Sequence, residues 1–211
     1  MTFFVFFFKR IWINFTLMNN QQLNEAYLAF DKANSADPNT ELINGTETPK
    51  ELIYGQRMTS VIESYAPNAD IALKLAARCQ HICRWESPRS NYEMNRVGYL
   101  TWRADLKKFH AKKASEILEK LNFDPEVIER VSFLLQKKKL KKDTDTQTLE
   151  DVICLVFLEH YYEAFFQKHT DEKIIDIVQK TWNKMSKKGH DAALKLSYSN
   201  KGLSLIQKAL S

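Results

Sequence analysis

The chain has 211 residues, of which 44% are hydrophobic and 27% are charged, and its formal net charge is +5. These values are ordinary for a globular protein and exclude a disordered chain. Only five Gly and five Pro residues are present, too few for a hairpin-rich β fold, so the composition favours helices. The three cysteines form no paired CxxC motifs, so we expect buried free thiols in the reducing cytoplasm rather than a structural zinc site.

The first 17 residues are mostly apolar and aromatic, but Lys9 and Arg10 interrupt them. A signal peptide carries its positive charge first and a cleavage site later, and a membrane span needs about 20 apolar residues without interruption. We interpret residues 1–17 as a mis-called leader outside the fold, with Met18 as the start. Residues 18–211 are then predicted to form a single helical domain. The alternative for the leader is a short membrane-surface anchor.

The rest of the chain predicts an all-α, compact single-domain bundle of about eight or nine helices. Pro, Gly and Asn residues indicate loops over residues 35–49 and 84–95. A helix predicted over residues 68–85 is apolar nearly all round, which is typical of a central buried helix. The other helices are expected at 20–34, 50–65, 98–121, 126–136, around 149–157, and at 171–185, 191–196 and 202–210.

Arginine and aromatic residues are concentrated between residues 84 and 103, here called the Arg-aromatic segment. Arginine binds phosphate or carboxylate through paired donors, and aromatic rings supply stacking faces. The pattern predicts a site for an anionic, phosphorylated or nucleotide-like ligand. In the alternative interpretation, these side chains pack with acidic neighbours and fix a long loop against the helical bundle. The candidate ligand-binding residues are Arg84, Trp85, Glu86, Arg89, Tyr92, Arg96, Trp102 and Arg103.

His81, Glu150 and Asp151 are the candidate catalytic residues. Each has a structural explanation: a lone histidine on a buried helix is usually a core residue, and acids in a first helical turn complement the helix dipole. If the later helix begins near Asp143 instead, Asp151 faces the interior. We predict that His81 and Asp151 face each other in one buried pocket, because a buried aspartate requires a partner.

Several segments between about residues 20 and 197 resemble the family catalogued as domain of unknown function 4202 (DUF4202). The family's catalogued description assigns no function. The similarity lies in DPN at 37–39, PKELIYGQRM at 49–58, LAARCQHICRWESPRSNY at 75–92, GYLTWR at 98–103, LKKD at 140–143, LEDVICLVFLEHY at 149–161 and KTWNKMS at 180–186.

A more remote resemblance is to HD-domain metal-dependent phosphohydrolases. It lies in LAARCQHI at 75–82, FHAKKASEILEKLNFDPEVIERV at 109–131 and LEDVICLVFLE at 149–159. The resemblance implies an HD-like fold and a divalent metal (Mn, Mg, Zn or Fe) held by His81, His110 and Asp151. Two positions depart from the pattern: Ile82 stands where the aspartate of the His-Asp doublet is expected, and Met58 stands near the expected first histidine.

Two hypotheses for function remain open. The first is a metal-dependent phosphohydrolase-like enzyme that acts on a phosphorylated small molecule or nucleotide. The second is a non-catalytic binding or regulatory module that senses an anionic metabolite through a degenerate HD site. Metal content of the purified protein distinguishes them. No membrane partner is expected.

Two lysine-rich stretches carry weaker signals. KMSKK at 184–188 is similar to a loop of class I aminoacyl-tRNA synthetases, but the partner HIGH signature and a Rossmann pattern are missing, so no synthetase activity is expected. KKKLKK at 137–142 is interpreted as a solvated charge run, and no nucleic-acid partner is expected.

Overall fold

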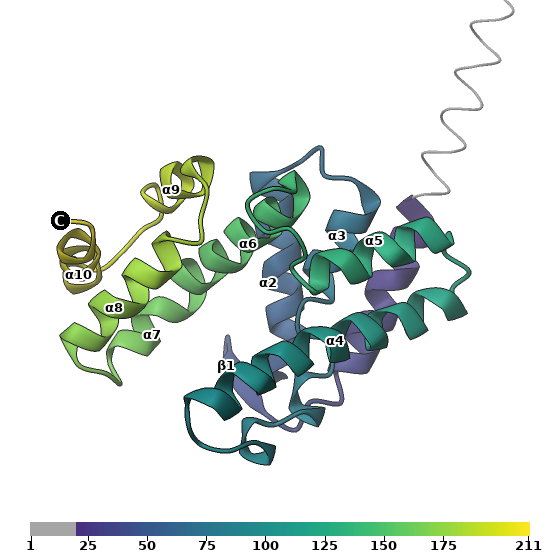
Figure 1. Cartoon of the computed structure of the whole chain (residues 1–211), viewed down its shortest axis with the longest axis horizontal. Helices are drawn as coiled ribbons and strands as arrows, with labels where there is room; N and C mark the ends of the chain where they lie inside the picture. The colour runs from purple at the N-terminus through teal and green to yellow at the C-terminus, as the bar shows by residue number, and fades with distance from the viewer. Residues whose placement is uncertain (1–19) are drawn as a thin grey trace, which may run out of the picture. The chain divides into compact units, whose positions relative to one another are not determined.

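The computed structural model describes residues 20–211, so the leader interpreted at residues 1–17 lies outside the described residues. The described chain is mainly helical, which confirms the predicted all-α class (Figure 1). Between residues 20 and 211, no helix is long and apolar enough to cross a membrane. The chain divides into two compact units, whose described parts are residues 20–55 with 70–136, and residues 56–69 with 137–211. The prediction of a single domain over 18–211 stays a prediction.

The first unit contains a helix over residues 20–34, a hairpin, the start of α2, and three further α-helices. Helices α4 and α5 lie side by side, and α3 packs against α5 (Figure 1). Pro125 opens α5 after Asp124, whose carboxylate accepts a hydrogen bond from the Glu126 amide, as the sequence predicts. The elements are β1 Thr40–Ile43, β2 Thr46–Pro49, α2 Lys50–Tyr65, α3 Ile71–Arg78, η1 Arg84–Glu86, η2 Arg89–Asn91, α4 Arg96–Lys120 and α5 Pro125–Leu135.

The loop predicted over residues 35–49 contains a two-stranded antiparallel hairpin, so that prediction is wrong in part. Strands β1 and β2 pair with Ile43 opposite Thr46. Asn44 and Gly45 form the turn with positive φ angles of 50° and 83°, a conformation that Asn-Gly pairs favour in tight hairpins. The hairpin delivers the chain directly to α2, because β2 ends one residue before α2 begins.

The helix predicted over residues 68–85 is also shorter than expected. Helix α3 ends at Arg78, and Cys83 has a left-handed φ of 51°. The Cys83 amide donates to Asn34 Oδ1 at 3.0 Å, so a buried side chain from the first helix holds this turn. His81 therefore lies in a turn after α3 and not on the helix.

The second unit contains the end of α2 and the helices after residue 137. Helices α8 and α10 pack together, and Ile174, Val178, Leu205 and Ile206 are buried there. The elements are α6 Thr144–Val156, a π-helical turn Phe157–Tyr161, α7 Tyr162–Phe166, α8 Asp171–Trp182, α9 Lys187–Ala193 and α10 Asn200–Leu210.

Helix α6 begins earlier than its apolar spacing indicates. Asp143 caps it by accepting a hydrogen bond from the Thr146 amide at 2.9 Å. Glu150 and Asp151 consequently lie in the middle of the helix and are buried. Their interpretation as acids of a first helical turn is wrong, and the alternative start near Asp143 is the one observed.

Candidate functional site

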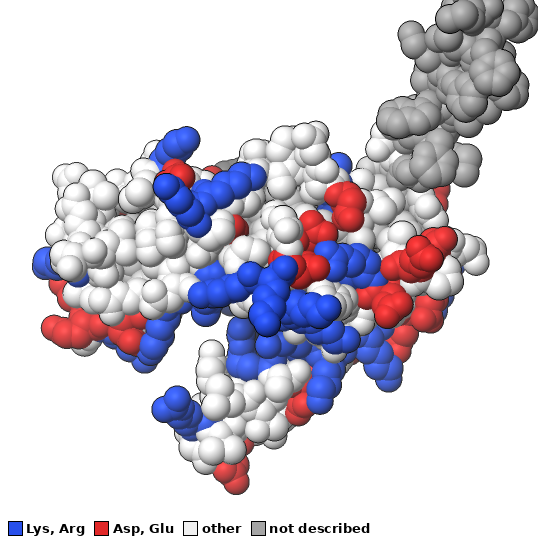
Figure 2. Space-filling model, turned by 45° about the horizontal axis from the view of Figure 1, so that its top comes forward, with Lys and Arg blue, Asp and Glu red and all other residues white. Residues whose placement is uncertain are grey.

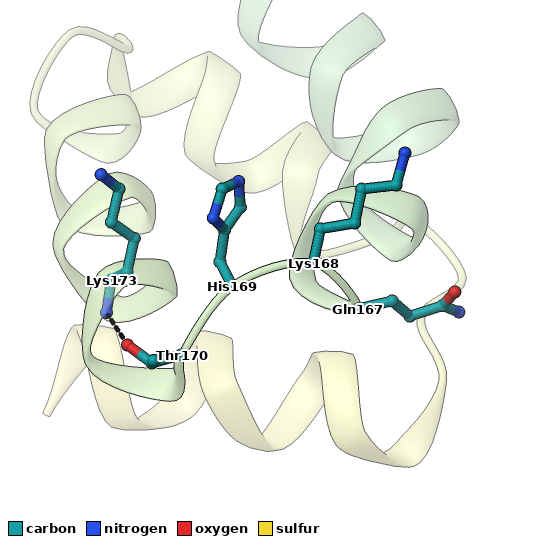
Figure 3. A pocket seen from close by; sticks show the side chains of 5 residues that line it. All are labelled: Gln167, Lys168, His169, Thr170 and Lys173. Carbon is teal, nitrogen blue, oxygen red and sulfur yellow. Dashed lines mark hydrogen bonds between the residues drawn. The ribbon is translucent and has the colours of Figure 1, made fainter.

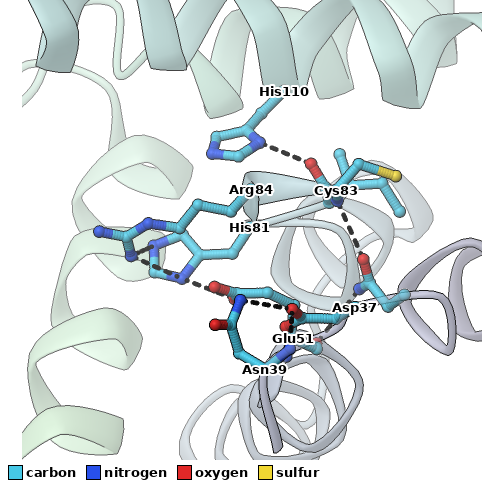
Figure 4. A network of polar contacts seen from close by, with 9 residues as sticks. Asp37, Asn39, Glu51, His81, Cys83, Arg84 and His110 are labelled. Atoms are coloured by element: carbon cyan, nitrogen blue, oxygen red, sulfur yellow. Dashed lines mark hydrogen bonds and ion pairs between the residues drawn. The ribbon is translucent and has the colours of Figure 1, made fainter. Parts of the chain in front are cut away.

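A polar cluster in the first unit joins the start of α2 to the turn after α3 (Figure 4). Glu51 Oε2 lies 3.3 Å from His81 Nδ1. The Glu51 side chain is 16% exposed and the His81 side chain is 17% exposed. The Tyr54 ring stacks on His81, with ring centroids 4.1 Å apart and planes 12° from parallel. Residues three apart share one face of a helix, so α2 presents both Glu51 and Tyr54 to the same imidazole.

Arg84 adds a positive charge to this cluster. Its Nη1 lies 3.3 Å from each ring nitrogen of His81, and its guanidinium lies 5.4 Å from the centre of the Trp102 ring. The Trp102 ring is fixed because its Nε1–H donates to the Ser87 carbonyl at 2.9 Å. A guanidinium carries five N–H donors, so Arg84 retains donors that can bind an anion.

His110 reaches the cluster from α4 and is only 3% exposed. Its Nδ1 lies 2.8 Å from the Ile82 carbonyl oxygen. A carbonyl can only accept, so Nδ1 carries the proton and Nε2 carries a lone pair. The ring centres of His110 and His81 are 5.8 Å apart. We refer to Glu51, His81, Arg84 and His110 as the Glu51 cluster.

Two buried side chains hold the backbone of the Glu51 cluster in place. Asp37 accepts hydrogen bonds from the amides of Asn39 and Glu51 at 2.9 and 3.1 Å, which fixes the start of α2. Asn34 donates to the Glu51 carbonyl at 3.2 Å while it accepts from the Cys83 amide. The start of α2 and the turn that carries His81 are therefore tied to one side chain, Asn34.

Burial changes the protonation of two groups in the Glu51 cluster. It raises the pKa of Glu51 from 4.5 to about 7, although the positive charge of Arg84 acts in the opposite direction. It lowers the pKa of His110 from 6.5 to about 3, and the charge of His81 lowers it further. Glu51 can therefore exchange a proton near neutral pH, whereas His110 stays a neutral hydrogen-bond acceptor.

The structure brings only part of the predicted Arg-aromatic site together. Arg84 belongs to the Glu51 cluster and packs over the Trp102 ring, but Glu86 forms an ion pair with Lys113 at 2.7 Å. The Tyr92 hydroxyl donates to Asp105 at 3.5 Å. The remaining candidates are the half-buried Trp85 and Arg103, the exposed Arg96, and Arg89.

Arg89 binds the backbone of its own loop. It donates to the carbonyl oxygens of Tyr92, Glu93 and Asn95 at 3.0, 2.5 and 3.2 Å. Arg89→Ala is therefore expected to lower the free energy of unfolding by about 2 kcal/mol, the typical effect of losing hydrogen bonds from a charged group. Urea unfolding would measure the loss, with the exposed Arg96→Ala as the control. Equal stability of both variants would contradict this role, and the predicted anion binding by Arg89 stays a prediction.

In the second unit, Asp151 is 2% exposed and accepts four hydrogen bonds. The donors are the Tyr65 hydroxyl at 2.8 Å, Gln147 Nε2 at 3.1 Å, and the Ser186 amide and hydroxyl at 2.7 and 2.5 Å. A Cβ at Gly189 would lie 2.8 Å from the Asp151 carboxyl carbon, so only glycine fits there without rearrangement. Asp151 thus anchors the stretch at 184–188, in which Ser186 caps α9.

Glu150, the third candidate catalytic residue, is engaged in the same unit. It is 4% exposed and forms an ion pair with Lys137, whose side chain is also largely buried. A paired buried acid satisfies the general requirement that a buried charge has a partner.

The predicted metal ligands fit a metal ion poorly. His81 and His110 belong to the first unit and Asp151 to the second, so their shared site, like the predicted pairing of His81 with Asp151, stays a prediction. Asp151 already accepts four hydrogen bonds, and Arg84 brings a positive charge next to His81. Within residues 20–211, no group of three or more His, Cys, Asp and Glu side chains is arranged to hold a metal ion.

An open pocket lies beside the start of α8 in the second unit (Figure 3). Its lining residues are Gln167, Lys168, His169, Thr170 and Lys173, and all five are exposed. Thr170 caps α8, and the His169 ring packs on Phe165 with centroids 4.4 Å apart. Exposed lysines orient a ligand weakly, so the Glu51 cluster is the stronger candidate site.

Sequence analysis missed Glu51 and Tyr54 as site residues. An acid in the first turn of a helix usually complements the helix dipole, so the position of Glu51 gave no reason to consider it a site residue. A usable signal was nevertheless present, because segments 37–39, 49–58 and 75–92, all of which resemble the same family, meet in this cluster.

The fold and site thus define a helical protein with a partly buried Glu-His-Arg cluster. The family model described as Domain of unknown function (DUF4202) matches residues 24–206, so the chain belongs to this family, as predicted. Searches of curated proteins and of solved structures give no match. The similarity to HD-domain proteins stays a prediction.

Proposed function

We propose that the protein binds a phosphorylated small molecule at the Glu51 cluster and transfers a proton to or from it through Glu51. The observation that carries the proposal is the contact of Glu51 with His81 beside the guanidinium of Arg84. A carboxyl group with a pKa of about 7 is suited to general acid–base catalysis at neutral pH.

Each residue of the cluster has its own role in binding or proton transfer. Arg84 supplies positive charge and paired donors for phosphate oxygens. Glu51, when protonated, can donate to a leaving oxygen, and when ionised it can accept a proton from an attacking hydroxyl group. His81 links Arg84 to Glu51, so anion binding and proton transfer are coupled. Lys and Arg side chains are prominent in Figure 2, and the formal net charge of +5 favours the approach of anions to the protein as a whole.

Calorimetric titration with glycerol 3-phosphate tests the binding half of the proposal. Arg84→Gln is expected to weaken binding by about tenfold or more, because it removes charged hydrogen bonds to phosphate. The control is Lys108→Gln, which removes an exposed positive charge on α4 outside the candidate site. Circular dichroism checks that both variants are folded. Unchanged affinity of a folded Arg84→Gln variant would overturn the proposal.

The second candidate is a non-catalytic sensor of an anionic metabolite. It is favoured by Asp151, which the HD resemblance implies as a metal ligand but which four donors engage in the second unit. Turnover of sugar phosphates and nucleotides separates the two candidates. If the protein converts one of these compounds and Glu51→Gln lowers the rate by about 100-fold, the enzyme proposal with Glu51 as the acid–base group is supported. Binding without turnover supports the sensor.

We also propose a cytoplasmic location. The support is that all three cysteines are buried free thiols, a state that a reducing compartment maintains.

A further inference from the structure

His110 contains a buried acceptor that the fold does not use. Its Nε2 is buried and has no hydrogen-bond partner among the residues that the structure describes. An unsatisfied buried polar atom is rare in folded proteins, so His110 Nε2 requires an explanation. The other ring nitrogen is held by the Ile82 carbonyl, so the ring cannot turn over without losing that hydrogen bond.

The surroundings of Nε2 define which partner it can take. Figure 4 shows the His110 ring beside the side chains of Arg84 and His81, with its Nδ1 hydrogen bond to the Ile82 carbonyl drawn as a dashed line. Since the ring is neutral and protonated on Nδ1, Nε2 can only accept a hydrogen bond. A ligand group that reaches it must therefore carry an O–H or N–H. An ammonium group would be repelled by Arg84, whereas a neutral hydroxyl would not.

We propose that His110 selects the ligand by accepting a hydrogen bond from one of its hydroxyl groups, so the substrate class is a phosphate ester of a polyol. This inference rests on the proposed function, because Arg84 provides the phosphate subsite. The His110 and His81 ring centres are 5.8 Å apart, and Arg84 Nη1 lies 3.3 Å from His81. The hydroxyl and phosphate subsites are therefore close enough for one small molecule to fill both.

A pair of probes that differ only in hydroxyl groups tests the inference. Glycerol 3-phosphate and n-propyl phosphate share a three-carbon chain and a phosphate. The wild-type protein is expected to bind glycerol 3-phosphate about tenfold or more tightly, because the apolar probe leaves Nε2 without a partner. The nitrogen-15 signal of His110 Nε2 should shift to lower frequency with glycerol 3-phosphate and stay in place with n-propyl phosphate.

His110→Leu removes the acceptor while it keeps a buried apolar side chain. The preference for glycerol 3-phosphate over n-propyl phosphate is expected to fall to about twofold or less. The wild-type comparison decides the question even if this variant fails to fold. Equal wild-type binding of both probes, lost in Arg84→Gln, would overturn the hydroxyl inference and leave the proposed function standing. Binding of neither probe, or binding that Arg84→Gln leaves unchanged, would overturn both.

Discussion

Replacing Asp151 with alanine is expected to lower the free energy of unfolding by about 3 kcal/mol, among the largest single-residue effects in this chain. The substitution leaves the Tyr65 hydroxyl, the Gln147 amide and both Ser186 donors without their common acceptor. Each of these partly buried donors would lose its hydrogen bond without regaining full contact with water.

The effect should be local to the part of the second unit that Asp151 holds. Ser186 caps α9, and the Lys188 ammonium donates to the Tyr65 carbonyl at 2.7 Å and lies 4.1 Å from the centre of the Tyr65 ring. Hydrogen exchange should therefore accelerate in α9 before it accelerates in α8. This behaviour would identify Asp151 as the anchor of the segment at 184–188.

Asp176→Ala is the matched control for this experiment. Asp176 is an exposed aspartate that forms an ion pair with Lys180 one turn away, and such pairs contribute little to stability. Urea unfolding of the two variants should separate them clearly. If Asp151→Ala is no less stable than Asp176→Ala, the structural role of Asp151 is wrong and its predicted role as a metal ligand regains support.

Hydrophobic spacing and end signals predicted most of the helices. The expected helix over 50–65 coincides with α2, and the Asp124-Pro125 pair marked the start of α5 correctly. These signals are local, because a cap or a periodic apolar face is encoded within a few neighbouring residues. The end of α3 was missed because Asn34, nearly fifty residues away, holds the turn at Cys83.

The candidate site could be predicted only in part for a related reason. His81, Arg84 and His110 were recognised by residue type, but Glu51, the acid that pairs with His81, was not. Residue type reveals which side chains can do chemistry, whereas the choice of partner depends on packing between distant segments. Tyr54 shows the same limit, since a tyrosine at that spacing resembles an ordinary half-buried helix residue.

The Glu51→Gln variant is expected to be more stable than the wild-type protein at pH 8, although it should be impaired in function. The folded-state pKa of Glu51 is about 7, above its ordinary value of 4.5. Between these values the folded protein binds a proton that the unfolded chain releases, so wild-type stability falls as the pH rises. At 1.36 kcal/mol per pKa unit, the full loss above pH 7 is about 3 kcal/mol.

Glutamine cannot ionise, so this part of the pH dependence should disappear in the variant. Urea unfolding at pH 4 and pH 8 would show similar stabilities at pH 4 and an advantage of Glu51→Gln of up to about 3 kcal/mol at pH 8. Glu63→Gln, an exposed glutamate on the same helix, is the control and should follow the wild-type profile. Parallel profiles for all three proteins would mean that the Glu51 carboxyl ionises normally, which removes the basis for proton transfer by Glu51. A partly buried acid that lowers stability by this amount is expected to serve function rather than stability.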